Sequence, residues 1–218
     1  MRNALITIGL VGLGLAGFAG QSYACEGDQV LFEDSFDSFD STWGTPSDSV
    51  KVDNGRLMMI PDPNEYVSVH NTAGVYDDID FCVTATAVSG DKLENAAYGV
   101  MFWYVDSNNY YAVEIDTNGK AAIYRSQRDN WLPQVRWQDT DSVKKGAGEA
   151  NQIRVVTLGT KATVYLNGTE FKSIKGVPKN GQQIGLIAES AKEASDTFTF
   201  DDLKVTLPKG SSSDDSQN

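Results

Sequence analysis

Residues 98–125 of this 218-residue chain read YGVMFWYVDSNNYYAVEIDTNGKAAIYR. Three runs rich in Val, Ile, Tyr and Phe are separated by two short polar turns, Asp106-Ser-Asn-Asn109 and Asn118-Gly119. Apolar runs between such turns are typical of β-strands joined as hairpins. The stretch therefore predicts three neighbouring antiparallel strands.

The rest of the sequence repeats this pattern, and almost no segment shows the 3.6-residue periodicity of a helix. The fold class that this predicts is an all-β sandwich of two antiparallel sheets. The strands are expected at 30–34, 50–60 (with a turn at Asn54-Gly55), 66–71, 79–89, 97–106, 110–116, 121–127, 133–138, 151–159, 161–168, 169–174, 183–190 and 196–207.

The two ends of the chain differ from this pattern. Arg2 precedes an apolar run that ends at Ser22-Tyr-Ala24, which predicts a signal peptide over 1–24, cleaved before Cys25. The run is short and broken by glycines, so we expect no membrane insertion once it is removed. A lipid-anchored Cys25 is the alternative, although Ser22 stands where a bacterial lipobox usually has Leu. Residues 25–207 are then one domain, and the polar residues 208–218 are a disordered tail.

The signal peptide predicts export to the periplasm or the exterior of a bacterium. The cysteines are therefore expected to meet oxidising conditions. Cys25 and Cys82 are the only two in the chain. In an oxidising compartment an even pair predicts one disulfide, and two free thiols are the alternative. The formal net charge of −12 argues against nucleic acid and anionic membranes as partners.

A mixed polar and aromatic face is predicted for the central strands. If Asn118-Gly119 is a two-residue turn, Thr117 faces Lys120 and Val113 faces Tyr124. Side chains alternate between faces along a strand, which collects six candidate ligand-binding residues on one side of the sheet or beside it. These are Trp103, Tyr110, Glu114, Arg125, Gln127 and Trp131.

Such a face suits a carbohydrate, because sugar C–H faces stack on aromatic rings and hydroxyl groups need donors and acceptors. The alternatives are that the aromatic rings belong to the core and that Glu114 and Arg125 form an ordinary cross-strand ion pair. A third alternative is a structural or adhesion protein of the cell envelope, in which the face contacts another protein.

The segment 98–125 resembles the central hairpins of concanavalin A-like lectin/glucanase domains. Later pieces, NQIRVV at 151–156, VYLNG at 164–168, IGLIAE at 184–189 and FDDLKV at 200–205, follow in the order such domains show. The resemblance covers residues 30–207 and is greatest to secreted bacterial laminin-G-like and 3-keto-disaccharide-hydrolase-like domains. It implies a jelly-roll sandwich that acts as a carbohydrate-binding, lectin-like module or, less often, as an enzyme.

Glu114-Ile-Asp116 raises the possibility of catalysis, because glycoside hydrolases with this fold carry Glu-Ile-Asp-x-x-Glu. Here Asn118-Gly119 follows instead, and the second glutamate of that motif is missing. The sequence therefore favours binding over catalysis. A glycoside or keto-sugar hydrolase that uses Glu114 and Asp116 is the alternative.

Acidic residues near both ends of the domain suggest a structural Ca²⁺ ion. The first and last strands of a jelly roll are often neighbours, so Asp34 and Asp201 are expected to lie close enough to share the ion. Solvated edge charges are the alternative.

Overall fold

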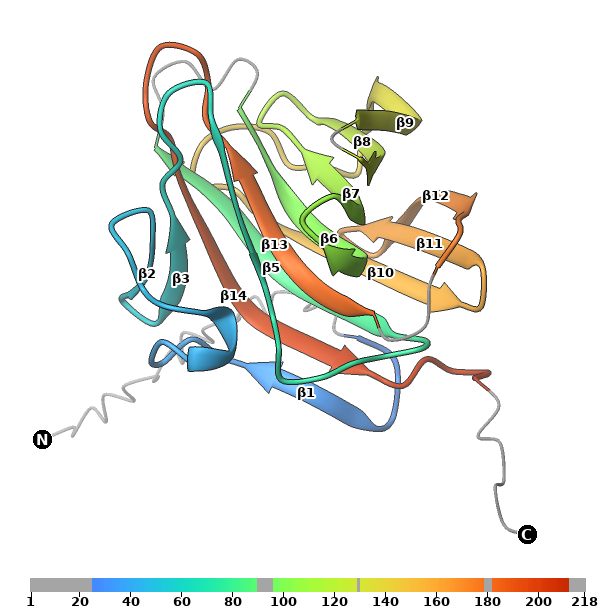
Figure 1. The fold of residues 1–218 in the computed structure, drawn as a ribbon. Helices are drawn as coiled ribbons and strands as arrows, with labels where there is room; N and C mark the ends of the chain where they lie inside the picture. Colours follow the sequence, from blue (N-terminus) through green and yellow to red (C-terminus); the bar gives the residue numbers. More distant parts are fainter. Residues whose placement is uncertain (1–24, 90–95, 129, 179–181, 212–218) are drawn as a thin grey trace, which may run out of the picture.

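The computed structural model describes residues 25–89, 96–128, 130–178 and 182–211, and the expected signal peptide and most of the expected tail lie outside these ranges. The described residues form two antiparallel sheets packed face to face (Figure 1). Within these residues, no helix has the length and hydropathy needed to cross a membrane. The predicted fold class, an all-β sandwich of two antiparallel sheets, is confirmed.

The first sheet has eight strands in the order β12-β11-β10-β5-β14-β3-β2, with β1 paired beside β3 on the same edge of β14. First and last strands are therefore neighbours, as predicted. The bounds are β1 (Val30–Asp34), β2 (Val50–Asp53), β3 (Arg56–Met59), β5 (Asp80–Ser89), β10 (Ala150–Leu158), β11 (Lys161–Leu166), β12 (Thr169–Lys175) and β14 (Thr197–Thr206). A 3₁₀ turn, η1 (Ser41–Trp43), follows β1.

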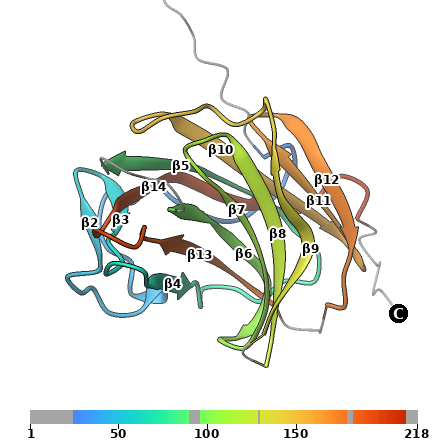
Figure 2. The same cartoon turned by 90° about the horizontal axis from the view of Figure 1, so that it is seen from above.

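The second sheet has six strands in the order β4-β13-β6-β7-β8-β9, which Figure 2 shows from β4 at the lower left to β9 at the right. Their bounds are β4 (Tyr66–His70), β6 (Ala97–Asp106), β7 (Asn109–Ile115), β8 (Lys120–Gln127), β9 (Asn130–Asp139) and β13 (Gln183–Glu189). The main core lies between the two sheets and includes Phe81, Phe102, Ile123, Phe198 and Phe200.

The register predicted for the β7–β8 hairpin is wrong by one residue. Val113 lies opposite Ile123 and not Tyr124, and Ala112 lies opposite Tyr124. The loop has three residues, 117–119, of which only Gly119 has a positive φ, 88°. A type I turn followed by a left-handed glycine gives this longer loop. Because side chains alternate, a shift of one residue moves every side chain of β8 to the other face.

A second irregularity, at Trp103, changes the face of the end of β6. The pairing of β6 with β7 shifts between Phe102 and Asp106, and Trp103 has a φ of 49°. Phe102 and Trp103 consequently both belong to the core between the sheets, while Tyr104 lies on the outer face. Gly176 leaves space for the indole, because a Cβ at that position would collide with it.

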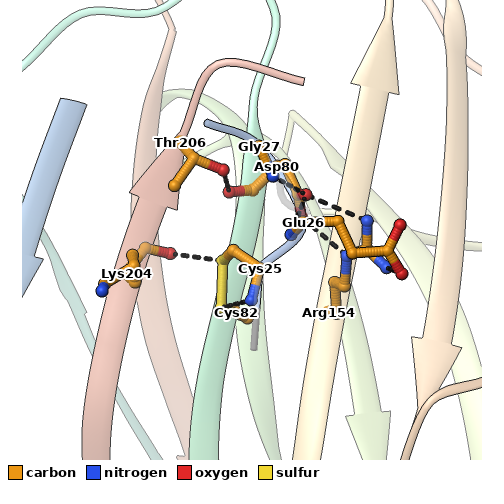
Figure 3. A network of polar contacts seen from close by, with 8 residues as sticks. All are labelled: Cys25, Glu26, Gly27, Asp80, Cys82, Arg154, Lys204 and Thr206. Atoms are coloured by element: carbon orange, nitrogen blue, oxygen red, sulfur yellow. Dashed lines mark hydrogen bonds and ion pairs between the residues drawn. A yellow bond between two sulfur atoms is a disulfide. The ribbon is translucent and has the colours of Figure 1, made fainter. Parts of the chain in front are cut away.

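The N-terminal segment is fastened to the outer face of the eight-stranded sheet, as Figure 3 shows. The predicted disulfide between Cys25 and Cys82 is confirmed. The backbone N–H groups of Glu26 and Gly27 donate to the Asp80 carboxylate, at 2.8 and 3.2 Å. Arg154 donates to both oxygens of the same carboxylate, at 2.7 and 2.9 Å.

This network depends on Asp80, which is 1 % exposed, because four donors converge on its carboxylate. Glu26 also pairs with Arg154, at 2.7 Å, but its own side chain is 60 % exposed. Removing one partner of a buried ion pair leaves an uncompensated charge, whereas exposed pairs contribute little.

Replacing Asp80 by Ala should therefore lower the free energy of unfolding by about 3–5 kcal/mol, measured by urea denaturation. Glu26→Ala is the matched control and should cost about 1 kcal/mol or less. Equal losses in the two variants would show that the Asp80–Arg154 pair does not hold this segment.

Candidate functional site

The outer face of the six-stranded sheet is strongly curved. Tyr66 on β4 and Trp131 on β9 belong to opposite edge strands, yet their ring centroids lie 6.3 Å apart. In a flat sheet, five gaps between six strands would separate the edges by roughly 24 Å. The sheet therefore curls until side chains from its two edges meet above its middle strands.

A hollow of about 320 Å³ lies inside this curve. We call it the groove, and define it by its seven lining residues. These are Tyr66, Glu114, Tyr124, Trp131, Trp137, Ile187 and Glu189. They come from five strands, so the groove exists only when the whole sheet is assembled.

Small residues explain why the floor of the groove is open around Glu114. Its cross-strand partners are Gly99 on β6 and Ala122 on β8. Ala112 precedes it on the same face of β7. None of these residues has a side chain longer than a methyl group, which leaves space beside Glu114 above the sheet.

Aromatic rings form the walls, with Trp131 at their centre. Its indole makes edge contacts with Tyr110 and Tyr124, at centroid distances of 5.9 and 5.7 Å, in addition to Tyr66. Trp137 lies 6.5 Å from Tyr124. Beneath them a second, smaller apolar cluster of Met101, Tyr104, Tyr110, Ala112 and Ile187 supports the rings.

Three of these rings remain accessible to a ligand. Tyr66, Trp131 and Trp137 are 51 %, 39 % and 38 % exposed. Exposed aromatic groups gathered around a hollow are unusual on a protein surface unless they bind something.

The Glu114 carboxyl group is the most unusual polar group of the groove. The side chain is 4 % exposed, and within the described residues it accepts no hydrogen bond and forms no ion pair. Burial, and secondarily the negative charge of Glu189, raise the pKa of Glu114 to about 8. Burial also raises the pKa of Glu189. Glu114 is therefore protonated at neutral pH in the unliganded protein.

Of the six residues predicted to bind ligand, Tyr110, Glu114 and Trp131 do share this face. The predicted face is wrong for Trp103, which is 3 % exposed and lies in the core. It is also wrong for Arg125 on β8, whose guanidinium lies 5.6 Å from the centre of the Tyr111 ring on the core side. Gln127 shares the side of Arg125, because it is two residues further along the same strand.

The groove also contains residues that are not among those six: Tyr66, Tyr124, Trp137, Ile187 and Glu189. Tyr124 was assigned to the opposite face by the one-residue error in register. Tyr66 and Glu189 face each other across β4 and β13, two strands far apart in sequence. If the β7–β8 loop had been predicted with three residues, the register would have placed Tyr124 on the outer face. No local feature of the sequence indicates that β4 and β13 lie beside β6.

Asp116, the proposed second catalytic acid, has a structural role. Its carboxylate accepts hydrogen bonds from the backbone N–H groups of Asn118, at 2.9 Å, and Lys120, at 2.7 Å. It caps the hairpin loop and does not line the groove. The pairing of Glu114 with Asp116 in hydrolysis is therefore not supported.

The predicted calcium ligands also have other partners. Asp34 accepts hydrogen bonds from the backbone of Phe36 and from the indole of Trp43, both at 2.8 Å. Asp201 pairs with Arg56 at 3.4 Å and accepts from the backbone of Asp202. The described part of the chain contains no group of three or more His, Cys, Asp or Glu placed to hold a metal. Asp34 and Asp201 do not fit a Ca²⁺ site.

No protein-family model matches the sequence, and a comparison with curated proteins finds no match. Solved structures do match the fold. The chain has a concanavalin A-like fold. A carbohydrate-binding module, CBM66 of Bacillus subtilis, matches with a TM-score of 0.57 at 14 % identity, over 69 % of this chain and 86 % of that one.

Two further structures show the same architecture. The carbohydrate recognition domain of Emp46p, in a potassium-bound form, matches with a TM-score of 0.61 at 11 % identity, over 80 % of this chain and 95 % of that one. A xylan β-1,4-xylosidase of Bacillus halodurans C-125 matches with a TM-score of 0.59 at 13 % identity, over 80 % of this chain and 39 % of that one. At such identities the matches show the fold alone.

The raised pKa of Glu114 predicts how stability depends on pH. The unfolded chain ionises this group near its ordinary value of 4.5, but the folded chain does so only near 8. Between these values the folded state holds more protons, so the free energy of unfolding should fall as the pH rises from about 4.5 to about 8, by at most about 5 kcal/mol.

Glu114→Gln should flatten this dependence in urea denaturations at pH 5 and pH 9. Glu149→Gln, an exposed position outside the groove, serves as control and should keep the wild-type slope. An unchanged slope in Glu114→Gln would show that this carboxyl ionises normally.

The burial of Trp103 predicts a structural and not a ligand-binding role. Trp103→Ala should lower the free energy of unfolding by about 3–5 kcal/mol, because it removes a large core side chain. The exposed Trp131→Ala should cost much less, about 1–2 kcal/mol. Chemical denaturation of both variants measures this difference, and a small cost at Trp103 would place its indole outside the core.

Proposed function

We propose that the protein is an exported carbohydrate-binding, lectin-like protein that binds a glycan in the groove. The single observation that carries the proposal is that exposed aromatic rings, the buried carboxyl group of Glu114 and the more exposed one of Glu189 surround one hollow of about 320 Å³. Aromatic walls suit the C–H faces of sugar rings, and carboxyl oxygens suit their hydroxyl groups.

The size of the groove agrees with this role. Its volume lies at the lower end of the range of small-molecule sites, and it is open, so a chain can enter with one or two sugar units in contact. The titles of two structural neighbours, a carbohydrate-binding module and a carbohydrate recognition domain, support the same class of ligand. The disulfide supports an oxidising, exported location.

The proposal predicts that Trp131 contributes most to binding, because its ring is exposed and also contacts the rings of three tyrosines. Trp131→Ala should weaken binding to a retained polysaccharide at least about tenfold, which corresponds to about 1.4 kcal/mol. Affinity electrophoresis or calorimetry of the purified protein measures this.

Tyr165→Ala is the matched control. Tyr165 is a half-exposed ring on the outward face of the eight-stranded sheet, where Arg154 stacks on it. This variant should bind as wild type does. Failure of the wild type to bind any member of a broad glycan panel would overturn the proposal, and an equal loss in the control would place the site elsewhere.

A further inference from the structure

The isolation of Glu114 indicates what the ligand must supply. The residue is 4 % exposed, its side chain lines the groove, and its carboxyl group has no hydrogen-bonding partner within the described residues. A buried polar group without a partner costs stability, and nearly all such groups in folded proteins are satisfied. A partner that arrives with the ligand would remove this cost.

Glu189 indicates that the group supplied by the ligand carries a positive charge. It reaches the groove from β13 and acts on Glu114 as a like charge. Two carboxyl groups around one hollow repel each other when both are ionised. In the described part of the chain neither forms an ion pair with Lys or Arg. A cation between them would offset the repulsion between the two carboxylates. It would also offset the cost of burying the negative charge of Glu114.

The walls of the groove favour an organic cation. Tyr66, Tyr124, Trp131 and Trp137 present four ring systems around the two carboxyl groups. Aromatic rings attract ammonium groups through the negative charge of their faces, most strongly where water is excluded. The formal charge of the whole chain, −12, would further attract a polycationic ligand.

The other titratable groups that the structure describes near the groove are phenols, one histidine and one arginine. Burial raises the pKa values of the Tyr104, Tyr110 and Tyr124 phenols, which stay neutral. His70 stacks on Tyr104, and burial lowers its pKa. Arg136 on β9 is a cation whose charge acts on Tyr124. The groups that face the groove or the apolar cluster below it are Tyr66 and His70 of β4, Glu189 of β13, Tyr104 of β6, Tyr110 and Glu114 of β7, Tyr124 of β8 and Arg136 of β9.

We propose that the groove selects amino sugars with a free, protonated amine, and that Glu114 and Glu189 hold the ammonium group between them. The ligand class is an oligosaccharide of unacetylated hexosamine. This rests on the proposed function, because the rings bind the sugar while the two carboxyl groups decide which sugar is preferred.

Calorimetry with three oligosaccharides of equal length and β-1,4 linkage tests the inference. These are oligomers of glucosamine, N-acetylglucosamine and glucose. At pH 6 the glucosamine oligomer should bind the wild-type protein at least about tenfold more tightly than the other two. Glu114→Gln and Glu189→Gln should each remove most of this preference, so that the affinity for the glucosamine oligomer falls to about that for the glucose oligomer measured with the same variant.

Glu149→Gln removes one negative charge outside the groove and is the matched control. It should keep the preference, whereas Trp131→Ala should weaken binding of all three oligomers. Bound ammonium would stabilise the ionised form of Glu114, which is protonated in the free protein because its pKa is about 8. Binding at pH 6, where the free oligomer already carries its ammonium protons, should therefore release on the order of one proton, measured from heats in two buffers.

Different results would count against the amino-sugar preference and against glycan binding as such. Equal affinities for the three oligomers would overturn this inference and leave the proposed function standing, whereas no binding to these or any other glycan would overturn both. A preference that Glu149→Gln reduces as much as Glu114→Gln would assign it to the overall charge. Cleavage of an oligomer that is lost in Glu114→Gln would assign the two carboxyl groups to hydrolysis and contradict the inference.

Discussion

The side chain of Asp116 fixes the geometry on which the groove depends. By accepting hydrogen bonds from Asn118 and Lys120, it closes a loop of three residues and not two. This sets the register of β7 against β8 and turns Tyr124 outward. With the other register Arg125 would occupy the groove in place of the phenol. A structural carboxylate in a turn thus decides the chemistry of a surface that it does not itself line.

The curvature of the six-stranded sheet has an equally direct consequence. It brings β4 and β9 close enough for the rings of Tyr66 and Trp131 to make an edge contact above the middle strands. Gly99 and Ala122 leave space beside Glu114, while the side chains that surround the groove leave this residue only 4 % exposed. The protein accepts a costly group at one position, which is the usual sign of a position kept for function.

The strand pattern of the sequence was sufficient to predict the sandwich, its strand limits to within a few residues and the disulfide. These follow from apolar periodicity, turn residues and an even cysteine count, which are local or compositional properties. Three candidate residues, Tyr110, Glu114 and Trp131, were also placed correctly. The errors at Trp103 and Arg125 have physical causes: a bulge with a left-handed tryptophan and an aspartate-capped loop, neither of which periodicity reveals. The contributions of Tyr66 and Glu189 depend on which distant strands pair.

The central claim, that the groove is the ligand site, is tested most directly by a crystal structure of the protein with a bound oligosaccharide. We expect a sugar ring against Trp131, with a polar group of the ligand within hydrogen-bond distance of the Glu114 carboxyl. A sugar bound on the eight-stranded sheet, or at the loops with the groove empty, would contradict it.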